Sequence, residues 1–119
     1  MQRKQLTVQN LKQMIFQINP SIHYSLNEQG IITIIRTQNH PIQNFLRKLS
    51  FNIPQKTYLD LDKYGSFIVQ QIDGKKSVYE IGQLLKNKFS EANENLYDRL
   101  ILYLHHLDVN EHIIQLINY

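Results

Sequence analysis

The sequence predicts an α+β fold in which a three-stranded antiparallel sheet is followed by a three-helix bundle, with an extra N-terminal helix. Two stretches carry alternating apolar residues, 22–26 and 57–61, and a run rich in β-branched residues lies between them at 31–37. After residue 62 the apolar residues instead recur every three or four positions, as in helices that bury one face. A sheet followed by helices gives a winged-helix-like order.

Residues 6–18 are predicted to form the N-terminal helix. Thr7 can cap it, and Asn19-Pro20 can end it, because the residue before a proline disfavours helical conformation. We expect this helix to pack on the body of the domain or on a partner chain. Its apolar face consists of Leu6, Val8, Leu11, Met14, Ile15 and Ile18.

A β-hairpin is predicted next, because residues 22–26 alternate and the turn sequence Asn-Glu-Gln-Gly leads into 31–37. Four isoleucines of the second strand fall on both faces, so we expect a central strand covered on both sides: Ile31, Ile32, Ile34 and Ile35. A short helix with a basic end at Arg47-Lys48 is predicted to follow Pro41.

The stretch 57–81 is predicted to hold a strand, a helix, a tight turn and the start of a second helix. Alternation places Leu59 and Leu61 on one face of the strand, and Asp62 can cap the first helix. The turn is assigned to Asp73-Gly74. Ser77 and Glu80 have capping-box spacing, which predicts a second helix directly after the turn.

The chain is predicted to end with a third core helix and a brief strand. The helix is expected to start at Asn93 or Asn95 and to run through Leu107, and 113–117 is the closing strand.

Composition limits the function classes. A chain of 119 residues predicts a single domain, 1–119, and the absence of cysteine excludes a disulfide framework and a cysteine nucleophile. We expect a cytoplasmic protein with no membrane segment, since no long apolar run and no signal-peptide pattern is present. Residues 1–56 carry a net charge of +6 and residues 57–119 a net charge of −3. Opposite charges attract within one fold or across a homodimer, and we favour these two interpretations over an acidic external partner.

Residues with catalytic or ligand chemistry give weak patterns. His105, His106 and His112 are the clustered histidines, but neighbours on a helix point about 100° apart and do not readily share a metal. Asp60 and Asp62 have the spacing of paired carboxylates, yet helix capping is the simpler role for Asp62. The glycines form no phosphate-binding motif. We therefore expect neither an enzyme nor a bound cofactor or metal.

DNA binding is the alternative that a winged helix raises. The third helix region, 91–107, carries Glu91, Glu94 and Asp98 against Arg99 alone, whereas duplex binding needs several cations that reach phosphates. A winged-helix transcriptional regulator is therefore the weaker interpretation.

Residues 57–117 resemble the PqqD-like family, also called RiPP recognition elements. The resemblance is carried by Leu59, Leu61, Asp62, Gly65, Ile72, Asp73, Gly74, Val78, Ile81, Leu85, Phe89, Arg99, Leu104 and Leu107. It implies the same fold and a non-catalytic chaperone that presents the leader segment of a ribosomally made precursor peptide to a modifying enzyme, commonly a radical S-adenosylmethionine protein. Any cofactor would then belong to that enzyme. The role of residues 1–56 is left open.

The resemblance also implies a location for the peptide. An extended leader would add as a strand beside residues 57–61 and lay its side chains against the third helix, which is β-augmentation. The strand residues are Thr57, Tyr58, Leu59 and Asp60, and the helix residues are Arg99, Leu100, Tyr103 and Leu104, with Arg99 suited to an acidic side chain of the ligand.

Overall fold

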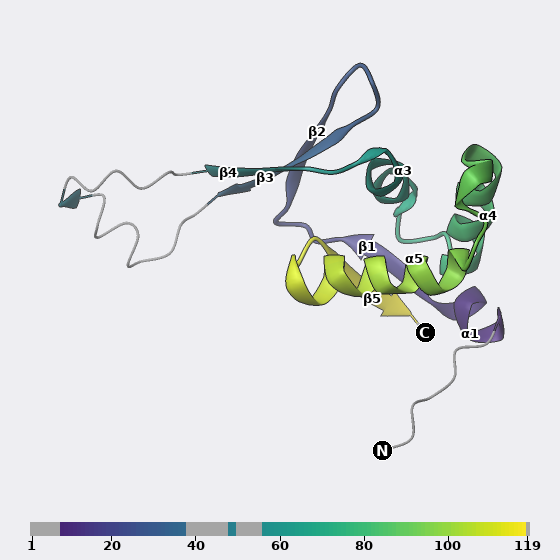
Figure 1. Cartoon of the computed structure of the whole chain (residues 1–119). Coiled ribbons are helices and arrows are strands. Elements are labelled where there is room, and N and C mark those ends of the chain that lie inside the picture. The colour runs from purple at the N-terminus through teal and green to yellow at the C-terminus, as the bar shows by residue number, and fades with distance from the viewer. Residues whose placement is uncertain (1–7, 38–47, 50–55, 119) are drawn as a thin grey trace. The chain divides into compact units, whose positions relative to one another are not determined.

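A computed structural model describes residues 8–37, 48–49 and 56–118 (Figure 1). The main elements are α1 (Val8–Gln13), β1 (Ile15–Ile18), β2 (His23–Leu26), β3 (Ile32–Thr37), β4 (Lys56–Asp60), α3 (Lys63–Gln71), α4 (Val78–Lys88), α5 (Leu96–His105) and β5 (Ile114–Asn118). A 3₁₀ turn at Ser90–Ala92 precedes α5 and a π-helical turn at His106–Asn110 follows it. The predicted fold class is confirmed: a three-stranded antiparallel sheet precedes three helices.

The chain divides into two compact units. Residues Ser21–Ser66 form one, called here the sheet unit, and Met1–Pro20 with Phe67–Tyr119 form the other, the helical unit. The prediction that all 119 residues make one domain stays a prediction. The predicted helix after Pro41 falls outside the described residues, apart from Lys48 and Leu49, which are both exposed.

The sheet unit contains the order β2-β3-β4, which confirms that β3 is the central strand. Ile32 and Ile34 are fully buried on one face of β3. Thr33 and Ile35, on the other face, are only half-buried, so that face is covered in part. The hairpin turn is closed by Asn27, whose side-chain oxygen accepts hydrogen bonds from the backbone N–H groups of Gln29 and Ile31, both at 2.9 Å.

A buried hydroxyl joins the sheet to the first turn of α3. Leu61 N–H donates to the carbonyl of Ile32 at 2.9 Å. The return bond, from Ile32 N–H to the Leu61 carbonyl, is replaced by two bonds through the Ser66 hydroxyl. Ile32 N–H donates to Ser66 Oγ at 2.8 Å, and Ser66 Oγ donates to the Leu61 carbonyl at 3.4 Å. The predicted cap is confirmed, because Asp62 Oδ1 accepts from Gly65 N–H at 2.7 Å. The strand-to-helix corner is therefore held by two side chains that follow β4.

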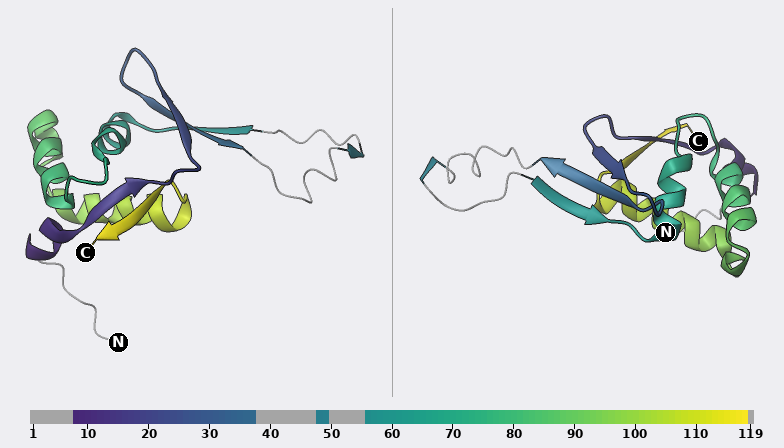
Figure 2. Two further views of the ribbon diagram at one scale, coloured as in Figure 1. Left: turned by 180° about the vertical axis from the view of Figure 1, so that it is seen from behind. Right: turned by 90° about the horizontal axis from the view of Figure 1, so that it is seen from above.

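The helical unit begins differently from the prediction. The helix expected over 6–18 ends at Gln13, and Ile15–Ile18 is a strand that pairs antiparallel with β5 (Figure 2). Phe16 and Ile114, which lie in the paired strands, are both buried. β-branched and aromatic side chains favour a strand, so pairing with a distant segment overrides the helical spacing of the apolar residues.

The turn between α3 and α4 follows its local sequence signals. Gly74 has φ of +76°, which a residue without a side chain adopts freely, and its N–H donates to the Phe16 carbonyl at 3.1 Å. Asp73 Oδ1 accepts from the backbone N–H groups of Lys75 and Lys76 at 2.9 and 2.8 Å. The capping box of Ser77 and Glu80 is present, as predicted.

The core of the helical unit lies between α3, α4, α5 and β5. Its fully buried members include Val69, Val78, Ile81, Leu100, Leu104, Leu107, Ile113 and Ile114. The predicted third helix and closing strand are confirmed, with Asn95 as the residue before α5. Within the described residues, no helix combines the length and the apolar character that crossing a membrane requires.

The first testable prediction concerns Ser66. Ser66→Ala should lower the free energy of unfolding by about 1–3 kcal/mol, because it leaves the Ile32 N–H buried without an acceptor. Urea titration followed by circular dichroism measures this loss. The control is Ser90→Ala at an exposed position, and equal stability of the two variants would contradict the role assigned to the hydroxyl.

The second prediction is a pH dependence at Asp73. The Lys76 backbone N–H, the Lys76 ammonium and the Lys75 N–H all bond to this carboxylate and hold its pKa well below the usual value of 3.8. A lowered pKa in the folded state stabilises the fold above pH 3.8, and this contribution disappears as the pH falls through the lowered value. The difference in melting temperature between the parent chain and Asp73→Ala should therefore shrink below about pH 4. A difference that is constant from pH 7 to pH 2 would disprove this.

Candidate functional site

β4 is an edge strand of the sheet. Within the described ranges it pairs with β3 on one side and with no strand on the other. Its side chains are largely exposed, with 66% of Tyr58 accessible to solvent. The unpaired backbone groups of such an edge are a template for one further strand.

The register of the ladder decides which backbone groups face this open edge. Leu61 N–H donates to Ile32, and Leu59 lies opposite Ile34, two residues further along. Hydrogen-bonded pairs recur at every second residue of an antiparallel ladder, so Leu59 and Leu61 direct their backbone groups toward β3. Tyr58 and Asp60 alternate with them and direct their N–H and C=O groups away from β3. These two residues therefore supply the binding groups of the edge.

The side chains of β4 divide between the two faces as the alternation predicted. Leu59 lies beside the buried Ile34 on the core face, and Tyr58 lies opposite Ile35 on the other face. Asp60 accepts a hydrogen bond from Thr33 Oγ1 at 2.6 Å. This bond, together with the capping role of Asp62, gives each carboxylate of the predicted pair a structural role.

The four predicted residues of α5 differ in their accessibility. Leu100 and Leu104 are buried, with exposed fractions of 2% and 1%. Arg99 is exposed and Tyr103 is half-buried, so these are the two members that a ligand can reach. The most exposed large apolar residue of α5 is Leu102, at 69%, which the sequence analysis did not single out. Its position off the 96/100/104/107 stripe was the available signal.

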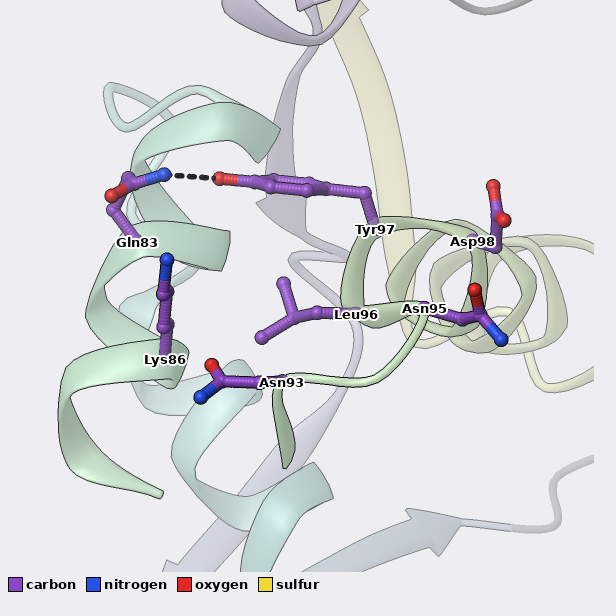
Figure 3. A pocket seen from close by; sticks show the side chains of 7 residues that line it. All are labelled: Gln83, Lys86, Asn93, Asn95, Leu96, Tyr97 and Asp98. Carbon is purple, nitrogen blue, oxygen red and sulfur yellow. Dashed lines mark hydrogen bonds between the residues drawn. The ribbon is translucent and has the colours of Figure 1, made fainter. Parts of the chain in front are cut away.

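A pocket of about 480 Å³ lies in the helical unit between α4 and α5 (Figure 3). Tyr97 points from α5 toward α4, where its hydroxyl accepts from Gln83 Nε2 at 2.8 Å and donates to the Tyr79 carbonyl at 3.1 Å. The rings of Tyr79 and Tyr97 are stacked at 5.7 Å, and Lys12 Nζ lies 5.1 Å from the centre of the Tyr79 ring. Burial raises the pKa of the Tyr97 phenol above its ordinary value. The phenol thus stays protonated, and its two hydrogen bonds join α5 to α4. The lining residues are Gln83, Lys86, Asn93, Asn95, Leu96, Tyr97 and Asp98.

The histidines do not form a metal site in the part of the chain that the structure describes. No group of three potential ligands converges among those residues. His105 and His106 are exposed, and His106 Nε2 lies 3.4 Å from Glu111 Oε1.

Comparison with protein families assigns the chain to a family. The family model described as coenzyme PQQ synthesis protein D (PqqD) matches residues 42–113, which is more than half of the chain. The chain belongs to the PqqD family. Members of this family act as peptide-binding chaperones in the synthesis of PQQ and of ribosomally made, modified peptides, and the family is generally non-catalytic. Searches of curated proteins and of solved structures found no match.

The third prediction tests the contact between α4 and α5. A side chain at Gly82 would collide with the Tyr97 ring, since an added Cβ overlaps its edge. Gly82→Ala should therefore destabilise the fold by about 1–3 kcal/mol, even though alanine favours a helix by about 1 kcal/mol over glycine.

The matched measurement places Gly82→Ala in a Tyr97→Ala background. Without the ring, only the helix preference remains, so the same substitution should be neutral or stabilising in urea unfolding. A loss of stability of the same size in both backgrounds would show that the ring is not the obstacle.

Proposed function

We propose that this chain is a non-catalytic chaperone that binds the leader segment of a ribosomally made precursor peptide and presents it to a modifying enzyme. The family supports peptide binding as the class of activity. The observation that carries the proposal is the outer edge of β4, where Tyr58 and Asp60 direct backbone groups outward and no strand of the described ranges pairs with them.

The proposed mode of binding is strand addition. An extended leader peptide forms N–H···O=C bonds with the outward groups of Tyr58 and Asp60, and these bonds give affinity that depends little on sequence. Specificity then comes from side chains that alternate along the leader. On one face the leader meets exposed Tyr58, and on the other it meets Leu59. An apolar leader residue would lie beside each of them.

The helix residues enter the proposal from the family resemblance. Arg99 and Tyr103 are accessible, so we assign ligand contacts to them, with Arg99 facing an acidic leader residue. Leu100 and Leu104 are buried, and we assign them the role of holding α5 in place behind those contacts.

The partner enzyme is proposed to be of the radical S-adenosylmethionine type, as is common in this family. The described residues offer no set of metal ligands, so the catalytic cofactor would be that of the enzyme. The chaperone would contribute by raising the local concentration of the precursor at the enzyme.

No specific observation favours the alternative of a DNA-binding regulator. The region that would enter the major groove carries exposed Glu91, Glu94 and Asp98 beside Arg99. Those carboxylates would lie against phosphates and oppose binding.

The fourth prediction tests strand addition through the backbone. The first step is to search the neighbouring genes for a short precursor frame, and a synthetic peptide of its leader segment is then titrated by calorimetry. Tyr58→Pro should weaken its binding at least about tenfold, because it removes an outward N–H and places a ring in the path of the added strand. Proline is tolerated there because edge strands accept it where the N–H faces solvent. Tyr58→Ala, which keeps the N–H, should weaken binding less.

The matched control is Tyr24→Pro on β2, at the opposite edge of the same sheet. This variant should bind the leader as the parent chain does. Equal affinity of Tyr58→Pro and the parent, with both folded by circular dichroism, would refute strand addition at β4. Arg99→Ala and Tyr103→Ala test the helix residues separately.

A further inference from the structure

The second edge of the sheet, β2, lacks the features by which proteins protect an exposed edge strand. All four residues of His23–Leu26 are exposed, and Tyr24 and Leu26 keep 44% and 52% of their surface accessible. No lysine, carboxylate or proline lies between Ser21 and Asn27, and the pairing with β3 contains no bulge. Edge charges, prolines and bulges normally prevent pairing with another chain. Among the residues that the structure describes, no strand pairs with the outer side of β2, so this edge is available for association.

The outward backbone groups of β2 belong to its apolar residues. Asn27 N–H donates to the Ile31 carbonyl at 3.0 Å, which makes this pair a hydrogen-bonded pair of the hairpin. Alternation along the ladder then directs the backbone groups of Ser25 and His23 toward β3 and those of Tyr24 and Leu26 toward the open edge. Extending the strand by one residue, as pairing with another chain would do, adds Ile22 to the outward set.

We propose that a second copy of this chain pairs through β2, antiparallel to the first, about a two-fold axis at Tyr24. In this register Tyr24 lies opposite Tyr24 of the second copy, and Leu26 lies opposite Ile22. The three outward residues of each copy are all used, in about six N–H···O=C bonds. Centring the axis on residue 23 or 25 leaves Leu26 or Ile22 unpaired, so Tyr24 is the favoured centre.

A second copy fits this edge because the edge is complementary to itself. The two-fold axis brings apolar residues against apolar residues on one face, and His23 opposite Ser25 on the other. No repulsion between two carboxylates or two lysines arises across the axis, since residues 22–26 contain neither. A charged partner would gain no ion pair here, since residues 22–26 carry no lysine, arginine or carboxylate.

The proposed dimer is weak and leaves the other edge free. Pairing of the two segments 22–26 buries less than the roughly 1,200 Å² of a stable interface, so association should appear only at high concentration. The resulting six-stranded sheet has a β4 edge at each end. If the proposed function holds, one dimer would therefore bind two leader peptides.

The first test uses single cysteines, since the chain has none of its own. Across the axis, Tyr24→Cys would place the two Cα atoms about 5.5 Å apart, which is within the range that a disulfide spans. Mild oxidation at about 100 μM protein should link most of this variant into dimers. Two exposed control variants should stay largely monomeric. In Ser25→Cys the cysteine lies opposite His23 of the second copy and not opposite the other cysteine, and Leu102→Cys is on α5, away from the proposed interface. Failure of Tyr24→Cys to link, or equal linking of all three, would overturn the proposal.

A charge exchange provides an independent test. Tyr24→Lys alone and Tyr24→Glu alone should abolish the concentration-dependent rise in mass seen by sedimentation velocity, because each variant sets like charges on the axis. An equal mixture of the two should restore the dimer. A mixture that stays monomeric overturns the axis at Tyr24. The leader titration described above uses Tyr58→Pro, so failure of the dimer and failure of leader binding are read separately.

Discussion

The hydroxyl of Ser66 occupies a position in the β3–β4 ladder that a backbone carbonyl would otherwise fill. It accepts the Ile32 N–H and donates to the Leu61 carbonyl, so the first turn of α3 is tied to two strands at once. Because the residue is fully buried, neither backbone group has water as a substitute partner. This link fixes the register at the end of β4, and the register determines that Tyr58 and Asp60, and not their neighbours, offer backbone groups to a ligand.

Elements with short-range signals could be predicted from the sequence. Asp62, the pair Asp73-Gly74 and the capping box of Ser77 and Glu80 act on backbone groups within a few residues, and all three have the predicted role. β1 could not be predicted in this way. Ile15 and Ile18 have helical spacing relative to Leu11, and only pairing with β5, about a hundred residues away, makes them a strand.

The placement of the candidate site residues in the fold could be predicted only in part, and their role in binding stays a prediction. Alternation assigned Tyr58 and Leu59 to opposite faces, but the direction of the backbone groups depends on the partner residue in β3, which the sequence does not reveal. In α5 the buried stripe continues through Leu100 and Leu104, so a helical projection alone could have removed them from the set of exposed contacts. The same projection would have identified Leu102 as an apolar residue on the solvent side.

The pairing of β1 with β5 has a consequence for the order of folding. Gln17 and Gln115, joined by a side-chain hydrogen bond at 3.0 Å, are separated by 98 positions, so their contact closes a loop of almost the whole chain. The entropy of closing so long a loop must be overcome before the contact contributes any stability, whereas the β2–β3 hairpin closes over a few residues. β1 and β5 should therefore pair last. A ribosome-bound chain would remain without this pairing until β5 had left the exit tunnel.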